Sequence, residues 1–350
     1  MSPSRPAPRE GIFVMPTSNP CKHLLDRGYL FLAPLLFFLL ISGSPQSFST
    51  ERPPARAGVG GETTIAVTAN LVLLPVRVTD ASGAFVPGLK LQDFRVYEDG
   101  QLQKLTLFEE EGTPVTVGLI VDHSRSMRSK LLDVATAVLV FAHSSNPQDE
   151  MFVVDFNDDV SVELMRGKAF SSDAEDLEEA LKAVSAQGRT ALYDAVSEGL
   201  LHMQYAHMEK RALVIISDGG DNASHIKYSQ VLTQARQSQT SIYSIVLVGS
   251  DEDEENPGLL RRLCKDTGGI AYFPRQGESV ADVWKEIARD LREQYTLGYA
   301  PQNMDHPDAF RKIQVKVAAP GHGRLLVRTR QGYSPAAEKQ PTAQLGAGAR

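Results

Sequence analysis

Between residues 114 and 292, short apolar runs alternate with amphipathic stretches. The apolar runs, where we predict β-strands, are residues 115–121, 151–156, 212–217, 242–248 and 270–273. The stretches between most of them place apolar residues three and four positions apart, as in Val280, Val283 and Ile287, which is the spacing of one helix face. Strands that are apolar throughout are typical of a parallel sheet covered by helices on both faces. We therefore predict an α/β domain with a doubly wound, mostly parallel sheet.

One pair of strands in this domain breaks the alternation with helices. The segments "MFVVDF" and "VSVELM" are separated only by Asn157-Asp158-Asp159. Three residues are enough for a hairpin but too few for the crossover that parallel strands need. We therefore expect residues 160–165 to form an antiparallel strand at one edge of the sheet.

The α/β domain is flanked by two segments of β character, residues 64–113 and 293–334. Both carry β-branched residues with partial alternation, and turn signals such as Asp99-Gly100 interrupt them. Neither segment has enough strands to bury a face well by itself, so we expect the two to pack as one sandwich-like unit. Two separate hairpins lying on the α/β domain are the alternative. Residues 335–350 are polar and rich in Ala and Gly, and we expect them to be disordered.

The first 49 residues have the pattern of an export signal. Basic residues precede a 13-residue apolar run at 29–41, which as a helix would reach about 20 Å and so fall short of a hydrocarbon core of about 30 Å. We therefore expect a signal peptide and a periplasmic or secreted protein, with an uncleaved anchor in the inner membrane as the alternative. Residues 50–63, rich in Pro, Gly and Arg, form a linker.

Charge and cysteine content narrow the picture further. The formal net charge of −7 gives no indication of the basic surface that nucleic-acid-binding proteins carry. Of the two cysteines, Cys21 would be lost with a cleaved signal, which leaves Cys264 without a partner for a disulfide. The folded part must therefore be stabilised by its core.

Three loops at the expected carboxyl edge of the parallel sheet carry oxygen ligands. Asp122-x-Ser124-x-Ser126 follows the first strand, Thr190 lies in "GRTALYDA" at a helix start, and Asp218 ends the strand 212–217 in "VIISDGG". Ligands bind at this edge in open parallel sheets. Carboxylates and hydroxyls without imidazole or thiolate suit a hard divalent ion, first Mg²⁺ and then Mn²⁺ or Ca²⁺.

These five positions, in this order and in these strand–loop–helix contexts, resemble the metal-ion-dependent adhesion site of von Willebrand factor A (VWA) domains. The resemblance covers residues 114–292. The flanks resemble those of a secreted bacterial (Acidobacteria-type) group of VWA-related proteins, through a small set of matching positions: Val78-Thr79-Asp80, Gly88-Leu89, Asp93-Phe94, Glu98-Asp99-Gly100 and Tyr295-Thr296-Leu297-Gly298-Tyr299.

The resemblance implies that Ser124, Ser126 and Thr190 touch the metal directly, and that Asp122 and Asp218 bind it mostly through waters. It also implies that a carboxylate of a partner protein completes the coordination sphere. Ser217 stands where a threonine is frequent in the family. His123 and Arg125 occupy variable positions between the ligands, and we expect both side chains to be exposed to solvent.

The sequence therefore predicts an exported, metal-dependent protein-binding module, for adhesion or as a scaffold, without catalytic residues. The partner would be a protein that supplies an Asp or Glu, with no nucleic acid, and with membrane contact only through an uncleaved N-terminal anchor. The alternative is a Mg²⁺-dependent hydrolase of phosphate esters. Binding is favoured because Arg189 is the only Lys or Arg directly beside Asp122, Thr190 or Asp218 in the sequence that could grip a phosphate.

Overall fold

The computed structural model describes residues 71–110, 112–164, 167–182, 185–247, 257–275, 278–302 and 309–335. The predicted signal or anchor region, the linker and the C-terminal tail beyond residue 335 lie outside these residues. None of the helices in the described part of the chain combines the length and the apolarity needed to cross a bilayer.

The centre of the structure is a six-stranded sheet in the order β10-β9-β8-β5-β6-β7. Its strands are β5 (Val115–Asp122), β6 (Glu150–Phe156), β7 (Val160–Glu163), β8 (Lys210–Ser217), β9 (Ser241–Val246) and β10 (Ala271–Tyr272). All neighbours are parallel except β6 and β7, which form the antiparallel edge pair. The predicted fold class, including the edge strand, is thus confirmed.

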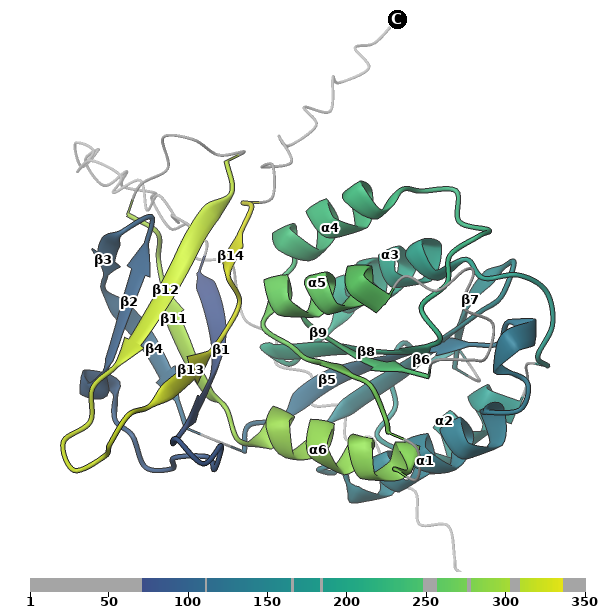
Figure 1. Ribbon diagram of the computed structural model, residues 1–350, viewed down its shortest axis with the longest axis horizontal. Coiled ribbons are helices and arrows are strands. Elements are labelled where there is room, and N and C mark those ends of the chain that lie inside the picture. The colour runs from purple at the N-terminus through teal and green to yellow at the C-terminus, as the bar shows by residue number, and fades with distance from the viewer. Residues whose placement is uncertain are drawn as a thin grey trace, which may run out of the picture. The chain divides into compact units, whose positions relative to one another are not determined.

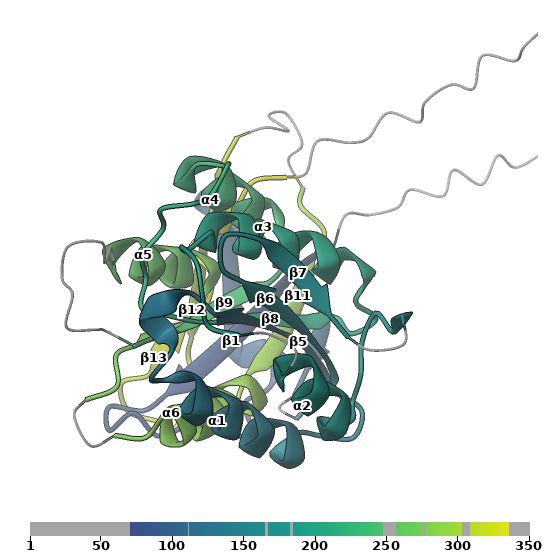
Figure 2. The ribbon, with the colours of Figure 1, turned by 90° about the vertical axis from the view of Figure 1, so that its right-hand side faces the viewer.

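Six helices cover the two faces of this sheet (Figures 1 and 2). They are α1 (Leu131–Ser144), α2 (Ala174–Lys182), α3 (Leu192–His202), α4 (Tyr228–Gln237), α5 (Pro257–Thr267) and α6 (Val280–Arg292). Helices α1, α2 and α6 pack into one apolar core and α3, α4 and α5 into the other. The strands between them are buried almost throughout, because each side of the sheet is covered.

The flanking segments form two four-stranded sheets, in the orders β13-β1-β11-β4 and β14-β12-β2-β3. Their strands are β1 (Val72–Thr79), β2 (Phe94–Glu98), β3 (Gln101–Gln103), β4 (Leu105–Glu109), β11 (Tyr295–Tyr299), β12 (Arg311–Val317), β13 (Leu326–Arg328) and β14 (Gly332–Tyr333). Alternate residues of β1 are buried, and apolar side chains from both sheets share one core. This arrangement is a β-sandwich.

Strands from before and after the α/β domain pair with each other in both sheets of the sandwich. In one sheet, β11 pairs antiparallel with both β1 and β4, and in the other β12 pairs antiparallel with β2. Thr296 lies opposite Glu109, so the chain leaves the sandwich and returns to it at neighbouring points. The α/β domain is therefore an insertion between two paired strands of the sandwich.

Ion pairs join the insertion to the sandwich. Asp290, on α6, contacts Arg77 from β1 at 3.3 Å and also pairs with Arg328 from β13. Tyr243, on β9, donates its hydroxyl hydrogen to the other oxygen of Asp290 at 2.6 Å. Three separate elements therefore satisfy the buried carboxylate of Asp290, which helps to hold α6 against the sandwich.

Candidate metal centre

The structure brings the loops that carry the predicted ligands to one edge of the parallel sheet. Asp122 is the last residue of β5, Asp218 follows the last residue of the neighbouring strand β8, and Thr190 lies two residues before α3. Strands β5 and β8 are adjacent and parallel, so their carboxyl ends lie side by side.

Hydrogen bonds hold Asp122 and the two serines in place. One oxygen of Asp122 accepts from the backbone N–H of Ser124 at 2.8 Å, and the other accepts from the hydroxyl of Ser217 at 2.6 Å. The hydroxyl oxygens of Ser124 and Ser126 lie 3.1 Å apart. Asp122 is fully buried, whereas Ser126 faces solvent. The Asp122 loop thus leads from the protein interior to the surface within four residues.

The electrostatics of Asp122 are unfavourable for a carboxylate. Burial raises the pKa of Asp122 to about 6, and the nearby charge of Asp218 adds to this rise. Hydrogen bonds from Ser124 and Ser217 oppose it and only partly offset the desolvation. A cation placed beside Asp122 and Asp218 would oppose this rise in the pKa of Asp122.

The Thr190 loop is joined by backbone hydrogen bonds to both of the other loops. Thr190 N–H donates to the side-chain oxygen of Asn222 at 2.9 Å, and Thr190 C=O accepts from the N–H of Asn222 and of Ala223. Arg125 N–H donates to Gly188 C=O at 3.3 Å. Thr190 itself is buried at 6% exposure. The three loops therefore form one connected, hydrogen-bonded surface.

His123 differs from the sequence-based expectation. We expected an exposed side chain, but the imidazole is only 3% exposed, and its Nδ1 lies 3.0 Å from Oδ1 of the buried Asp155 on β6. His123 N–H also donates to Phe156 C=O at 2.8 Å. The residue turns inward because it directly follows a strand whose neighbour, β6, presents a carboxylate to it. Arg125, by contrast, is exposed as expected.

Several residues that position the site were not assigned a role from the sequence. Ser217 donates to Asp122, and Asn222 supports the backbone of Thr190. Gly188 has a φ of +75°, and a Cβ there would lie 1.9 Å from an oxygen of Asp158. That oxygen instead accepts from Arg189 N–H at 3.0 Å. The "DGGDN" and "GRT" strings signal turns, but these partners become visible only in three dimensions.

The carboxylates of this site differ from other buried carboxylates of the protein. Among residues whose exposure is described, eight acids are buried. Six of them pair with a basic side chain: Glu98 with Arg311, Asp149 with Arg292, Asp155 with His123, Asp176 with Lys168, Asp266 with Arg236, and Asp290 with Arg77 and Arg328. Only Asp122 and Asp218 have no basic partner within the described residues. Both belong to the predicted metal site.

The kinds of side chain at this edge limit how a metal could be held. Within the part of the chain that the structure describes, no group of three or more His, Cys, Asp or Glu side chains gathers closely enough to hold a metal ion. The side-chain oxygens that this edge offers besides the two carboxylates are the hydroxyls of Ser124, Ser126 and Thr190. Such a mixed set of oxygen donors suits Mg²⁺, which keeps part of its water shell.

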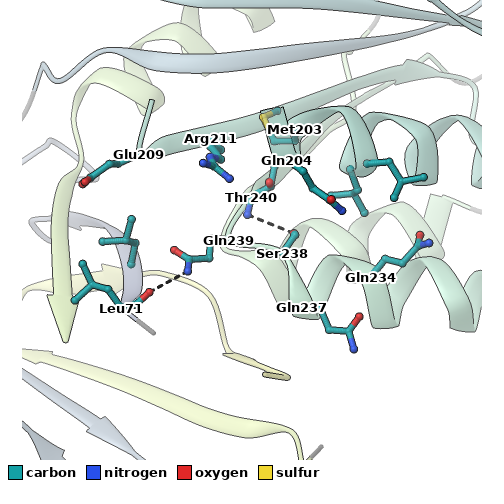
Figure 3. Close-up of a pocket in the computed structure, with 13 residues that line it drawn as sticks. Leu71, Met203, Gln204, Glu209, Arg211, Gln234, Gln237, Ser238, Gln239 and Thr240 are labelled. Carbon is teal, nitrogen blue, oxygen red and sulfur yellow. Dashed lines mark hydrogen bonds between the residues drawn. The ribbon is translucent and has the colours of Figure 1, made fainter. Parts of the chain in front are cut away.

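A separate hollow of about 920 Å³ lies at the opposite edge of the sheet, next to the start of β1 (Figure 3). Leu71 and Leu73 line one side, and the ends of α3 and α4 line the other. Gln239 donates its side-chain N–H to Leu71 C=O at 3.0 Å. None of the five predicted ligands lines this hollow, so the two features are independent.

Solved structures with a similar fold include a von Willebrand factor type A protein from Catenulispora acidiphila (13% identity, TM-score 0.46, covering 77% of this chain and 76% of that chain). They also include the pilus adhesin SpaC from Lactobacillus rhamnosus GG in an open conformation (11%, 0.42, 73% and 49%) and the conserved hypothetical protein BatB from Bacteroides thetaiotaomicron (17%, 0.39, 51% and 97%). No curated protein matches the chain. The family described as the von Willebrand factor type A domain matches residues 117–220, which contain all five predicted ligand positions.

Proposed function

We propose that this protein is an exported protein-binding module that engages its partner through a divalent metal ion, Mg²⁺ in the first place. The metal would be held at the carboxyl edge of the six-stranded sheet by Asp122, Ser124, Ser126, Thr190 and Asp218. An Asp or Glu of the partner would complete its coordination sphere.

The observation that carries this proposal is the absence of a basic partner for Asp122 and Asp218 among the described residues. The six other buried acids each have one, which is the usual condition for burying a charge. Two adjacent buried carboxylates without such a partner need a cation from outside the chain. The ordered hydroxyls of Ser124 and Ser126, 3.1 Å apart, supply further hard ligands at the same place.

The contacts of Asp122 favour a particular division of roles. Both of its oxygens already accept hydrogen bonds from the protein, at 2.8 and 2.6 Å. This supports a carboxylate that meets the metal through water, as the family resemblance implies, while the hydroxyls of Ser124, Ser126 and Thr190 bind directly. Neutral hydroxyls leave most of the ion's charge uncompensated, so the bound metal would attract a carboxylate from a partner.

The export part of the proposal rests on the sequence of residues 1–49. Basic residues followed by a short apolar run are the pattern of a secretory signal. A periplasmic or secreted location would place the metal face where proteins of the envelope or the surroundings can reach it.

The alternative, a Mg²⁺-dependent phosphate-ester hydrolase, is less well supported. A nucleophilic Asp122 would need a free oxygen, but both of its oxygens are engaged by the protein. Arg189, which adjoins Thr190 in the sequence, is bonded to Asp158 at 2.9 Å. Metal-dependent release of phosphate from a generic aryl phosphate would reverse this ranking.

Calorimetric titration with MgCl₂ and MnCl₂ tests the metal site directly. The wild-type protein should bind one ion, and Asp218→Ala should abolish the heat of binding. Asp282→Ala, which removes an exposed carboxylate on α6, is the control and should bind as the wild type does. Unchanged heats for Asp218→Ala would show that the ligand assignment is wrong.

Pull-down of envelope and culture proteins with the immobilised protein tests the binding function. Capture in MgCl₂ should be lost in EDTA and in the Ser124→Ala/Ser126→Ala variant, while circular dichroism shows that the variant remains folded. A partner captured equally well in EDTA and by the double variant would mean that the metal is not part of the interface.

A further inference from the structure

The loops that surround the two serines carry a group of arginines. Arg125 lies between Ser124 and Ser126, Arg128 follows two residues after Ser126, and Arg189 precedes Thr190. All three are exposed. This is unexpected in a chain with a formal net charge of −7, because acidic side chains outnumber basic ones over the whole protein. We refer to Arg125, Arg128 and Arg189 as the arginine rim.

Hydrogen bonds place the three arginines on one continuous surface. Arg125 N–H donates to Gly188 C=O, so the first two loops run side by side at this point. Arg128 donates a guanidinium N–H to Ala186 C=O at 3.0 Å. Arg189 donates its Nε–H to Asp158 at 2.9 Å, with its side chain still 66% exposed. The rim therefore borders the Ser124–Ser126 hydroxyls from two adjoining loops.

Arg125 is the member of the rim with the most unused hydrogen-bonding capacity. Its side chain makes no hydrogen bond or ion pair with any described residue, although its charge contributes to lowering the pKa of Asp158. A guanidinium has five N–H donors arranged in a fork that fits a carboxylate. Arg189 is already oriented by Asp158, so less conformational freedom is lost when it meets a ligand.

The acidic residues of the surrounding loops do not cancel the rim. Asp158 is paired with Arg189, and Asp194 is paired with His225. Asp221 accepts hydrogen bonds from Tyr193 N–H and from the Ser224 hydroxyl, and so is turned toward the protein. Asp159 is the remaining exposed acid of the β6–β7 turn. Arg125 and Arg128 are left without an acidic partner among the described residues.

We propose that Arg125 and Arg189 recognise a second carboxylate of the partner, so that the segment bound at the metal face is acidic and carries two acids on one face. This deepens the proposed function and rests on it: the first acid would meet the metal and the second the arginine rim. The Cα of Arg125 is about 3.8 Å from those of Ser124 and Ser126, and its guanidinium reaches several ångströms farther. In an extended peptide, side chains two residues apart lie on one face about 7 Å apart. The spacing Asp-x-Asp therefore fits both contacts.

Three synthetic peptides, coupled densely to a biosensor surface, test this proposal on the full chain in MnCl₂. They are Gly-Ser-Gly-Asp-Gly-Ser-Gly, Gly-Ser-Gly-Asp-Gly-Asp-Gly and an amide control with Asn in place of both Asp. Dense coupling raises the number of peptides on the surface, so that weak binding still gives a measurable signal. The two-acid peptide should bind about five-fold more tightly than the one-acid peptide, the effect of one exposed charge pair. If the second acid served only as an alternative ligand for the metal, the affinity of the two-acid peptide would be about two-fold higher, because the number of equivalent ligands doubles.

Variants of Arg125 and Arg189 test whether the preference for the two-acid peptide comes from the arginine rim. Arg125→Gln and Arg189→Gln should each lower the preference for the two-acid peptide toward two-fold while leaving the affinity for the one-acid peptide unchanged. Arg324→Gln, which replaces an exposed arginine between β12 and β13, is the matched control and should keep the wild-type preference. Salt at 0.5 M should also reduce the preference, because exposed charges are screened.

The outcomes separate this inference from the proposed function. A preference of two-fold or less in the wild type, or one of five-fold that survives both arginine variants, overturns the role of the rim. Binding of the one-acid peptide that persists in EDTA overturns the metal-dependent function, whatever the arginine variants do. If neither acidic peptide binds more tightly than the amide control, both proposals fall.

Discussion

The two ends of the α/β domain handle buried charge in opposite ways. At the end that meets the sandwich, Asp149 and Asp290 are each paired with arginine, and inside the sandwich Glu98 pairs with Arg311 and accepts from Tyr299 and Tyr333. At the carboxyl edge, Asp122 and Asp218 have only hydroxyl and backbone donors among the described residues. The same chain therefore pairs its buried acids with arginine next to the sandwich and leaves Asp122 and Asp218 without a described basic partner at the proposed metal site.

The largest effect should follow from breaking a completed pair. Arg311→Met leaves Glu98 buried without a basic partner and should lower the free energy of unfolding by about 3–5 kcal/mol, as measured by urea denaturation. The double variant Glu98→Gln/Arg311→Met removes the charge as well and should recover most of the loss. If the single variant costs less than about 1 kcal/mol, the pair contributes little to stability and the comparison fails at this end.

Lys210 is a buried basic residue that forms no ion pair with any described acid, so it tests the effect of burying an unpaired charge. It is 3% exposed and donates to Leu291 C=O at 3.2 Å, and burial lowers its pKa from 10.5 to about 8. Because the unfolded chain keeps this proton up to about pH 10.5, stability should rise with pH from about 8 upward, by about 3 kcal/mol over the whole interval.

The pH effect can be assigned to Lys210 with a single variant. Lys210→Met should remove the rise, so the unfolding free energy of the wild type minus that of the variant should increase between pH 7.5 and 9.5. Parallel pH curves for the two proteins would show that this ammonium group is not destabilised by burial.

Adding a divalent metal should stabilise the protein by supplying a cation to Asp122 and Asp218. At a free Mg²⁺ concentration 100 times the Kd, the free energy of unfolding should rise by about 2.7 kcal/mol through mass action. The rise should be smaller in the Ser124→Ala/Ser126→Ala variant and should fall to about half at pH 5, because protons compete for Asp122, whose pKa is raised to about 6. An equal rise at pH 5 and pH 7.5 would place the stabilising metal elsewhere.

The smallest predicted effect is a change in stability whose direction distinguishes the two ends of the α/β domain. In EDTA, Asp218→Asn should leave stability unchanged or raise it by about 1 kcal/mol, because the substitution removes the charge that raises the pKa of Asp122. Asp290→Asn, made in a completed pair, should instead lower stability. Thermal unfolding of the two variants compares the two ends directly, and a clear loss of stability in both would contradict the difference between them.

The fold class was predictable from the sequence because each of its features is local. Apolar strands, helical spacing and the three-residue connection at Asn157-Asp158-Asp159 are read within short windows, and the structure confirms the parallel sheet with one antiparallel edge pair. The five ligand positions stayed a prediction supported by residue type and spacing. The structure places their loops at one sheet edge, but the metal itself is a matter for experiment.

What the sequence did not reveal depends on contacts between distant segments. His123 was expected to be exposed, and only the position of Asp155 on the neighbouring strand explains why it is buried. Asp290 pairs with Arg77, more than 200 positions earlier in the chain, and with Arg328, 38 positions later, and no local pattern encodes either pair. An aspartate inside the apolar run "MFVVDF" was the one available signal that a buried polar partner was needed.

The insertion of the α/β domain between β4 and β11 has a mechanical consequence. Both connections leave the sandwich at the same end of an antiparallel strand pair, where Glu109 lies opposite Thr296. A load applied at the metal face is therefore divided between two backbone tethers that pull β4 and β11 in the same direction. Such a load does not slide these two strands past each other. It is carried instead by the pairing of β11 with β1 and by the apolar contacts of both strands in the core of the sandwich.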